Sequence, residues 1–304
     1  MATEQEFQQK LKACCSMAET YLEDIKIDRP VTDDAFDTAD LQDKMSKLAK
    51  VLSHDATKFT IACKPPRKPA EGVRMVDEMS NTFFRLVGFY NTIPASAGQQ
   101  YRDTYRKAIR DLLMGALSLW HAFRDDGNKF MVPTAALWET CKMMETGLPA
   151  NNQAAVLAQW KDMQATMEDA KQEVHELAEG GDDDEDGDIE PEMKPVAAQC
   201  AKLVDLAVFV STKIERRCLR ETKDVNICDQ LYIKSSALAD ETDVVVSQLY
   251  DVDDPEIMRT KHIAAYVDCL CDLMAFAQKH TTEEHSKWFE MGIKKVREIA
   301  EKKQ

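Results

Sequence analysis

The chain of 304 residues is long enough for two domains of ordinary size, and it contains only 10 glycines and 10 prolines. So few turn-forming residues argue against β-sandwiches, β-barrels and disordered linkers. Because 54 Asp and Glu outnumber 39 Lys and Arg, the formal net charge is −15, which disfavours direct binding to nucleic acid or to anionic membrane surfaces.

Apolar residues recur at steps of three and four along almost the whole chain, which is the helix period. The first half predicts a helix from about Phe7 to Ile25 and others spanning Leu41–Phe59, Val73–Tyr90, Tyr105–Phe123 and Ala135–Met144. Ser96 and Gln99 have the spacing of a capping box that would open the fourth of these helices. In the fifth, Ala135, Trp138, Cys141 and Met144 are expected on one side.

The second half predicts a long helix from about Asn151 to Glu179, followed by helices over Val196–Ile214, Ile227–Leu249, Ile263–Ala277 and Trp288–Ala300. Asp254 followed by Pro255 is a typical helix start, and Thr281 with Glu284 has capping-box spacing. Long helices with short connections pack as antiparallel bundles. We therefore expect an all-α fold of two antiparallel four- or five-helix bundles.

The domains are expected at residues 1–149 and 150–304, with an acidic linker at 180–195 in the second. The terminal helices could instead pair, which would make one bundle discontinuous in sequence. Nine acidic and no basic residues lie between Glu179 and Glu192. A solvated linker is the first interpretation of this tract, and a docking segment for a basic partner surface is the second. The residues that would carry such an interaction are Asp182, Asp183, Asp184, Glu185, Asp186, Asp188 and Glu190.

A calcium-binding loop is a third interpretation of the same tract. Asp182, Asp184, Asp186 and Gly187 fit the first positions of such a loop. Position 12 needs a bidentate Glu but holds Met193, so calcium binding would be weak.

The sequence gives little support for a metal site or a catalytic site. Cys269 and Cys271 point about 200° apart on a helix at ~100° per residue, and His280 and His285 fall across the joint of two predicted helices. The sequence has no nucleophile-elbow motif and no phosphate-binding glycine loop. We therefore expect no catalytic residue, no metal site and no cofactor. The nine cysteines are interpreted as buried thiols of a reducing compartment.

Three stretches resemble a known family: KVLSHDATKFTIAC at Lys50–Cys63, the stretch from Phe89-Tyr90-Asn91 through RKAIRDLLMGALSLWHAF, which ends at Phe123, and ALWETCKMMETGLPANNQAAVLAQW at Ala136–Trp160. They are similar to the cyclin-D-binding protein family, also called the GCIP or Maid family. The likeness is strongest from about residue 45 to 178. It implies a non-enzymatic, all-helical adaptor that binds D-type cyclins or helix-loop-helix transcription regulators in cytoplasm and nucleus.

Two alternatives remain open at this point. Long-helix bundles also serve as cytoskeletal or adhesion-type adaptors, and an enzyme would need a deep pocket with a perturbed titratable group. We expect protein partners, no direct nucleic acid and no membrane. The oligomeric state and the contact residues are not specified by the sequence.

Overall fold

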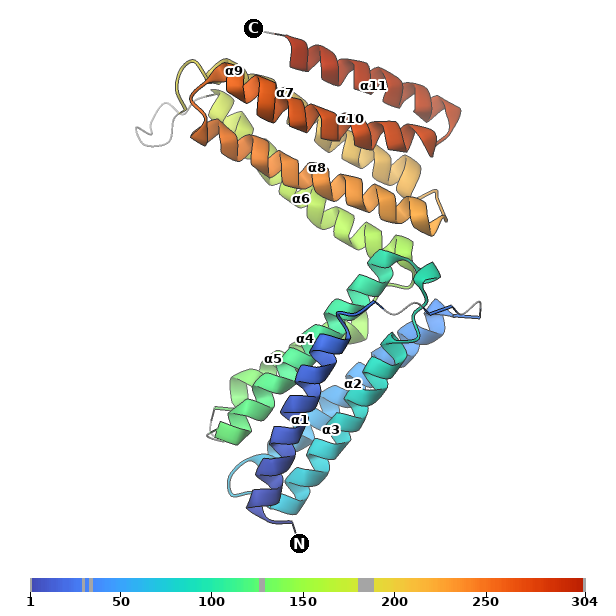
Figure 1. Cartoon of the computed structure of the whole chain (residues 1–304), viewed down its shortest axis with the longest axis vertical. Coiled ribbons are helices and arrows are strands. Elements are labelled where there is room, and N and C mark those ends of the chain that lie inside the picture. Colours follow the sequence, from blue (N-terminus) through green and yellow to red (C-terminus); the bar gives the residue numbers. More distant parts are fainter. Residues whose placement is uncertain (1, 29–30, 33–34, 126–128, 180–188, 303–304) are drawn as a thin grey trace. The chain divides into compact units, whose positions relative to one another are not determined.

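The computed structural model describes residues 2–28, 31–32, 35–125, 129–179 and 189–302. Throughout these ranges the chain is helical apart from turns and short connections, which confirms the all-α fold (Figure 1). The chain divides into two compact units, unit 1 at Met1–Ala155 and unit 2 at Val156–Gln304.

Unit 1 begins with three helices: α1 (Glu4–Asp24), α2 (Thr38–Cys63) and α3 (Pro69–Tyr90). The first has a capping box that the sequence analysis missed, since the Thr3 side chain accepts from Glu6 N while the Glu6 carboxylate accepts from Thr3 N. Asp37 caps the second through Ala39 N at 2.8 Å. The first two helices therefore start where a short polar side chain accepts a hydrogen bond from an unpaired backbone N–H. The third starts at a proline, which has no backbone N–H to satisfy.

The helix α4 (Gln99–Asp125) follows a 3₁₀ turn at Ala95–Ala97. The expected capping box of Ser96 and Gln99 is wrong, because Ser96 lies inside that 3₁₀ turn. The Gly98 carbonyl accepts the first helical bond from Arg102 N instead, and Gly98 has a φ of 103°.

The helix α5 (Met131–Gly147) buries only part of the expected side, since Cys141 and Met144 are buried as expected but Ala135 and Trp138 are not. The buried residues are Thr134, Leu137, Cys141 and Met144. Ala135 and Trp138 are instead exposed, because the face that meets the core is turned by about one residue. An aromatic side chain that periodicity assigns to the core thus lies at the surface.

The five helices of unit 1 enclose one apolar core that includes Phe59, Phe83, Trp120 and Phe123. Around this core α1 contacts α3 and α4, while α2 contacts α3 and α5, and α5 also contacts α4. Most neighbours run antiparallel. The helices α1 and α3 run parallel, as the pairings of Lys10 with Asp77 and Cys14 with Ser80 show.

Unit 2 contains most of α6 (Asn152–Glu179), then α7 (Lys194–Ile214) with a π-helical end at Glu215–Leu219, and α8 (Val225–Asp251). Asp254 caps the next segment through Glu256 N at 2.8 Å, as expected. This segment comprises α9 (Pro255–Ile257), a π-helical stretch at Met258–Ile263 and α10 (Ala264–Lys279). The last helix is α11 (Glu283–Glu301).

The expected capping box of Thr281 and Glu284 is wrong. The residue before α11 is Thr282, which makes no side-chain cap bond. Thr281 Oγ1 donates instead to the Arg217 carbonyl at 3.1 Å, so this hydroxyl ties the loop to the end of the π-helical turn.

The core of unit 2 gathers apolar side chains of α6, α7, α8, α10 and α11. Tyr266 is fully buried, and its hydroxyl accepts from Thr242 Oγ1 at 3.4 Å. The helix α11 lies against α10 and α7. The segment Lys194–Leu219 is long and apolar enough to cross a membrane by length and composition, and most of its apolar window is buried in this unit.

Candidate functional site

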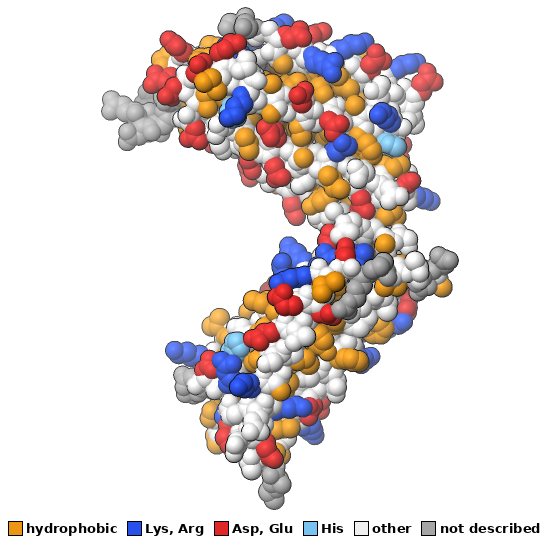
Figure 2. Space-filling view, viewed as in Figure 1, with side chains coloured by type: hydrophobic (Ala, Val, Ile, Leu, Met, Phe, Trp, Pro, Cys, Tyr) orange, Lys and Arg blue, Asp and Glu red, His pale blue; other side chains and the backbone are white. Residues whose placement is uncertain are grey.

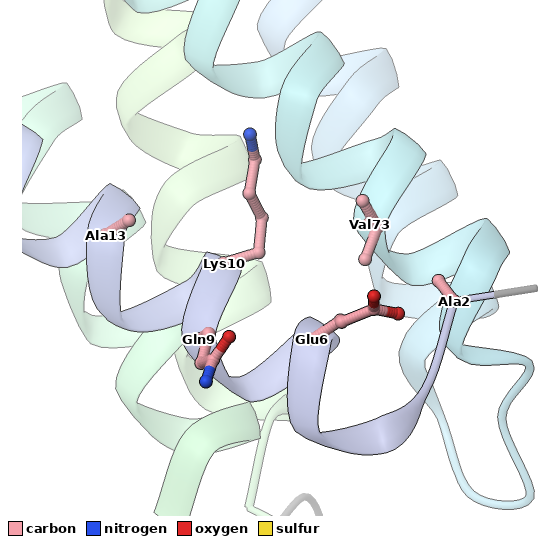
Figure 3. A pocket seen from close by; sticks show the side chains of 6 residues that line it. All are labelled: Ala2, Glu6, Gln9, Lys10, Ala13 and Val73. Carbon is pink, nitrogen blue, oxygen red and sulfur yellow. The ribbon is translucent and has the colours of Figure 1, made fainter.

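A hollow on unit 1 lies between α1 and α3 and measures about 620 Å³ (Figure 3). Its charged side chains are already engaged by the fold. Lys10 pairs with Asp77, and the Glu6 carboxylate accepts from Thr3 N at 2.6 Å. The charged groups of this hollow therefore stabilise helix ends and helix pairs.

The nine cysteines are all free thiols, eight of them buried and Cys269 half-buried, which confirms their interpretation as buried side chains. Burial raises the pKa of Cys63, Cys141 and Cys200 to about 12. A thiol with so high a pKa holds almost no thiolate at neutral pH, so these cysteines are packing groups and poor nucleophiles. The reducing compartment stays a prediction.

Two histidines of unit 2 each contact a different side chain of the fold. His175 Nε2 lies 3.1 Å from both carboxylate oxygens of Asp205, across the contact of α6 and α7. The ring of His280 lies against that of Phe276 at the end of α10, with centroids 4.5 Å apart and the two planes tilted by 43°. Among the residues that the structure describes, no three His, Cys, Asp or Glu side chains gather as metal ligands would.

Six residues of the predicted interaction tract, Asp182, Asp183, Asp184, Glu185, Asp186 and Asp188, lie outside the described residues. Glu190 is described and exposed. Met193, at position 12 of the calcium-loop pattern, is buried in the core of unit 2 and immediately precedes α7. An apolar thioether held in that core supplies no oxygen ligand to a calcium ion.

Unit 1 carries an apolar surface where α2 and α5 pack together. Thr60 Oγ1 and Thr134 Oγ1 lie 3.2 Å apart and fix the end of α2 beside the start of α5. Ile61 follows Thr60, while Met131 and Trp138 stand three residues before and four residues after Thr134. On α5, Met131 and Trp138 repeat the direction of Thr134, and Ile61 is the chain neighbour of Thr60 at the seam of the two helices.

The side chains of this seam are strongly exposed for their size. Ile61 and Met131 are each 73% exposed, Val132 is 79% exposed and Trp138 is 41% exposed. We call Ile61, Met131, Val132 and Trp138 the α2/α5 surface. Isolated apolar residues at a surface are ordinary, but several on two packed helices suit a protein contact. Figure 2 shows further hydrophobic side chains between the charged ones on both units.

Sequence reasoning missed this surface because it assigned Trp138 to the core. The available signal was Pro133, which marks a helix start: Met131 and Val132 precede it, and the buried stripe of α5 begins only at Thr134. At the far end of the two helices, Ser46 Oγ donates to the Glu145 carbonyl at 2.7 Å, and Gln42 Nε2 donates to that of Leu148 at 2.6 Å. Side-chain hydrogen bonds thus join the two helices near both ends.

The fold and its exposed helical faces define an all-α helical-bundle protein suited to protein interaction. Residues 44–180 match the family model described as Grap2 and cyclin-D-interacting, N-terminal. The resemblance to the cyclin-D-binding protein family is therefore confirmed, and this region carries it. No catalytic family is indicated.

A curated relative is the cyclin-D1-binding protein 1 homolog of Xenopus laevis, which is 28% identical over 161 residues. The aligned region covers 51% of this chain and 48% of the relative. The chain thus spans about half the length of the curated relative that it matches. The α2/α5 surface lies inside the region that the family model matches.

Proposed function

We propose that this protein is a non-enzymatic regulatory adaptor that binds cell-cycle or transcription regulators through helical faces. The partners proposed are a D-type cyclin or a helix-loop-helix regulator. The protein is proposed to act in cytoplasm and nucleus, which imaging of the tagged full chain in its own cells would test. The observation that carries the proposal is the α2/α5 surface within the family-matched region.

The chemistry of this surface supports a contact with an amphipathic helix. Ile61, Met131 and Val132 offer aliphatic and thioether area, and Trp138 adds an aromatic ring with an indole N–H. Aromatic side chains and Met are enriched at the centres of interfaces. Charged side chains stand at the rim, since Lys142 lies 3.5 Å from Glu145 farther along α5. An apolar centre with a polar rim is the usual arrangement of a protein interface.

The test is direct binding of the purified full chain to a purified D-type cyclin and, separately, to a helix-loop-helix regulator. We expect the double variant Ile61→Gln and Val132→Gln to weaken binding by about tenfold or more, because it places two amides where apolar contact is needed. Both side chains are highly exposed, so the fold should be kept.

A matched control is the double variant Phe84→Gln and Met114→Gln. These side chains are 68% and 54% exposed and belong to α3 and α4, away from the α2/α5 surface. Equal weakening by both double variants would contradict the assignment of the surface. If the wild type bound neither partner and instead cosedimented with filaments, the cytoskeletal alternative would replace this proposal.

A further inference from the structure

A second surface lies on unit 2, where α7 and α11 pack along each other. At one end the rings of Phe209 and Trp288 are 5.6 Å apart. Toward the other end Gln199 Nε2 donates to the carbonyls of Ile299 and Ala300 at 2.8 and 2.9 Å. These contacts show that the two helices run antiparallel and share one long seam.

The end of this seam near Gln199 is hollowed and lined by several lysines. A cavity of about 300 Å³ is lined by Pro195, Gln199, Lys202, Lys295, Ile299 and Lys302. All three lysines are exposed. Lys295 Nζ lies 3.6 Å from Glu298, and no carboxylate of the described residues is within ion-pair distance of Lys202 or Lys302. Positive charge is thus concentrated at one place on a chain whose net charge is −15.

The end of the seam near Phe209 and Trp288 adds apolar surface and a fourth lysine. Phe209 is 56% exposed, although it belongs to a helix that is otherwise largely buried. Lys213 Nζ lies 5.2 Å from the centre of the Trp288 ring, within reach of a cation–π contact. We call Lys202, Phe209, Lys213, Trp288, Lys295 and Lys302 the α7/α11 seam.

The α7 members of the seam fall on one helical face. Lys202, Phe209 and Lys213 are spaced by seven and four residues, which repeats the side-chain direction along a helix. On α11, Trp288 and Lys295 are seven residues apart and share a face, and Lys302 directly follows the helix beside the same cavity. Cations and aromatic rings therefore line both sides of the seam, in an order that an extended or helical segment could follow.

We propose that the α7/α11 seam docks an acidic segment of a partner protein that carries aromatic or large aliphatic side chains. The carboxylates would lie over Lys202, Lys295 and Lys302, and the apolar side chains over Phe209 and Trp288. Charge complementarity carries the choice of occupant, because the remaining net charge of the protein repels nucleic acid and other large polyanions. The seam is separate from the α2/α5 surface, so this inference does not depend on the proposed function.

The experiment uses the full chain and a short fluorescein-labelled peptide of Asp and Glu with two Phe residues, followed by fluorescence anisotropy. We expect the triple variant Lys202→Gln, Lys295→Gln and Lys302→Gln to bind about tenfold more weakly, with a flatter dependence on salt. Phe209→Gln should also weaken binding while leaving the salt dependence unchanged, because it removes apolar contact without altering charge.

The matched control is the triple variant Lys12→Gln, Lys107→Gln and Lys161→Gln. These lysines are exposed on α1, α4 and α6, and their replacement changes the net charge by the same amount. Full binding by this control and loss by the seam variant would support the proposal. Equal loss by both triple variants, or equal binding of a peptide with Asn and Gln in place of the acids, would overturn it. Binding to phosphatidylserine vesicles with no binding to the peptide would overturn it as well.

Discussion

Asn152 Oδ1 accepts a hydrogen bond of 2.9 Å from Tyr101 N, although the two residues are 51 positions apart in the sequence. Tyr101 N belongs to the first turn of α4, where a helix has no internal acceptor for its N–H groups. Asn152 is the first residue of α6. A side chain at the start of one helix therefore caps another, and both residues are buried.

Replacing Asn152 with Ala should destabilise unit 1 by about 1–3 kcal/mol, because it leaves a buried backbone N–H without its acceptor. Urea unfolding of the full chain would measure the loss. Asn151→Ala is the matched control, since Asn151 Oδ1 caps Ala154 N at 2.9 Å in an exposed position. The control should cost about 1 kcal/mol or less. Equal losses would contradict the special role of the buried cap.

Gly98→Ala should also be destabilising, for two separable reasons. The residue has a φ of 103°, and an added Cβ would lie 2.2 Å from Asn152 Cγ. In the Asn152→Ala background the contact disappears and only the backbone strain remains. The second substitution should therefore cost less in that background than in the wild type, and a double-mutant cycle would measure the difference. If the losses in unfolding free energy were strictly additive, the contact between the added Cβ and Asn152 would contribute nothing to the cost of Gly98→Ala.

Asp55 predicts a specific dependence of stability on pH. Burial raises the pKa of this carboxyl, while Thr82, which donates to it at 3.3 Å, and Lys58 lower the pKa by less. The folded pKa lies above the unfolded value, so ionisation of Asp55 costs stability as pH rises through this interval. Asp55→Asn should therefore be more stable than the wild type at neutral pH, and the advantage should vanish at a pH below the unfolded pKa.

Denaturation at several pH values would check the Asp55 prediction. Asp43→Asn on the exposed side of the same helix removes the same formal charge and serves as the control. A stability difference that persists unchanged at acidic pH would show that the Asn side chain acts by packing and not by its charge.

The burial of the cysteines predicts how fast their thiols react in the native and in the unfolded protein. At neutral pH an aromatic disulfide reagent should react slowly with the native protein, because burial blocks access and raises thiol pKa values, that of Cys269 to about 11. All nine cysteines should react once the protein is unfolded in guanidinium. Cys269→Ser should remove most of the slow native reaction. Rapid reaction of a buried thiol would reveal local opening of its helix.

The interpretation of the acidic tract as a docking segment makes a prediction about association kinetics. Neutralising Asp182, Asp183, Asp184, Glu185, Asp186 and Asp188 should slow association with a basic partner surface and flatten its salt dependence, with little change in stability. Stopped-flow association of the full chain would measure this. A variant with the same residues in scrambled order keeps the charge, so it should associate as the wild type does. Unchanged kinetics in the neutralised variant would make the tract a spacer.

The positions of the helices could be predicted from the sequence because apolar spacing and prolines act locally. Asp254 caps its helix as expected, since the cap and the donors it satisfies are neighbours in the chain. Ser96 failed as a cap because it lies inside a 3₁₀ turn, and a distant side chain, Asn152, caps Tyr101 N in the first turn of α4. Thr281 failed because its hydroxyl donates to the distant Arg217 carbonyl.

The candidate surfaces were harder to predict because a shift of one residue along a helix decides whether a side chain is buried or exposed. Leu137 is buried and Trp138 is exposed, although both fit an apolar face of α5. The α7/α11 seam joins lysines about a hundred residues apart, and no spacing in the sequence brings Lys202 beside Lys295.

The sequence by itself determined that this protein is helical and acidic, because the helix period and the charge are properties of local pattern. Only the tertiary structure decided which helix faces remain exposed and which cations stand together. The physical reason is that burial depends on how each helix is rotated about its own axis, and that rotation is set by its packed neighbours.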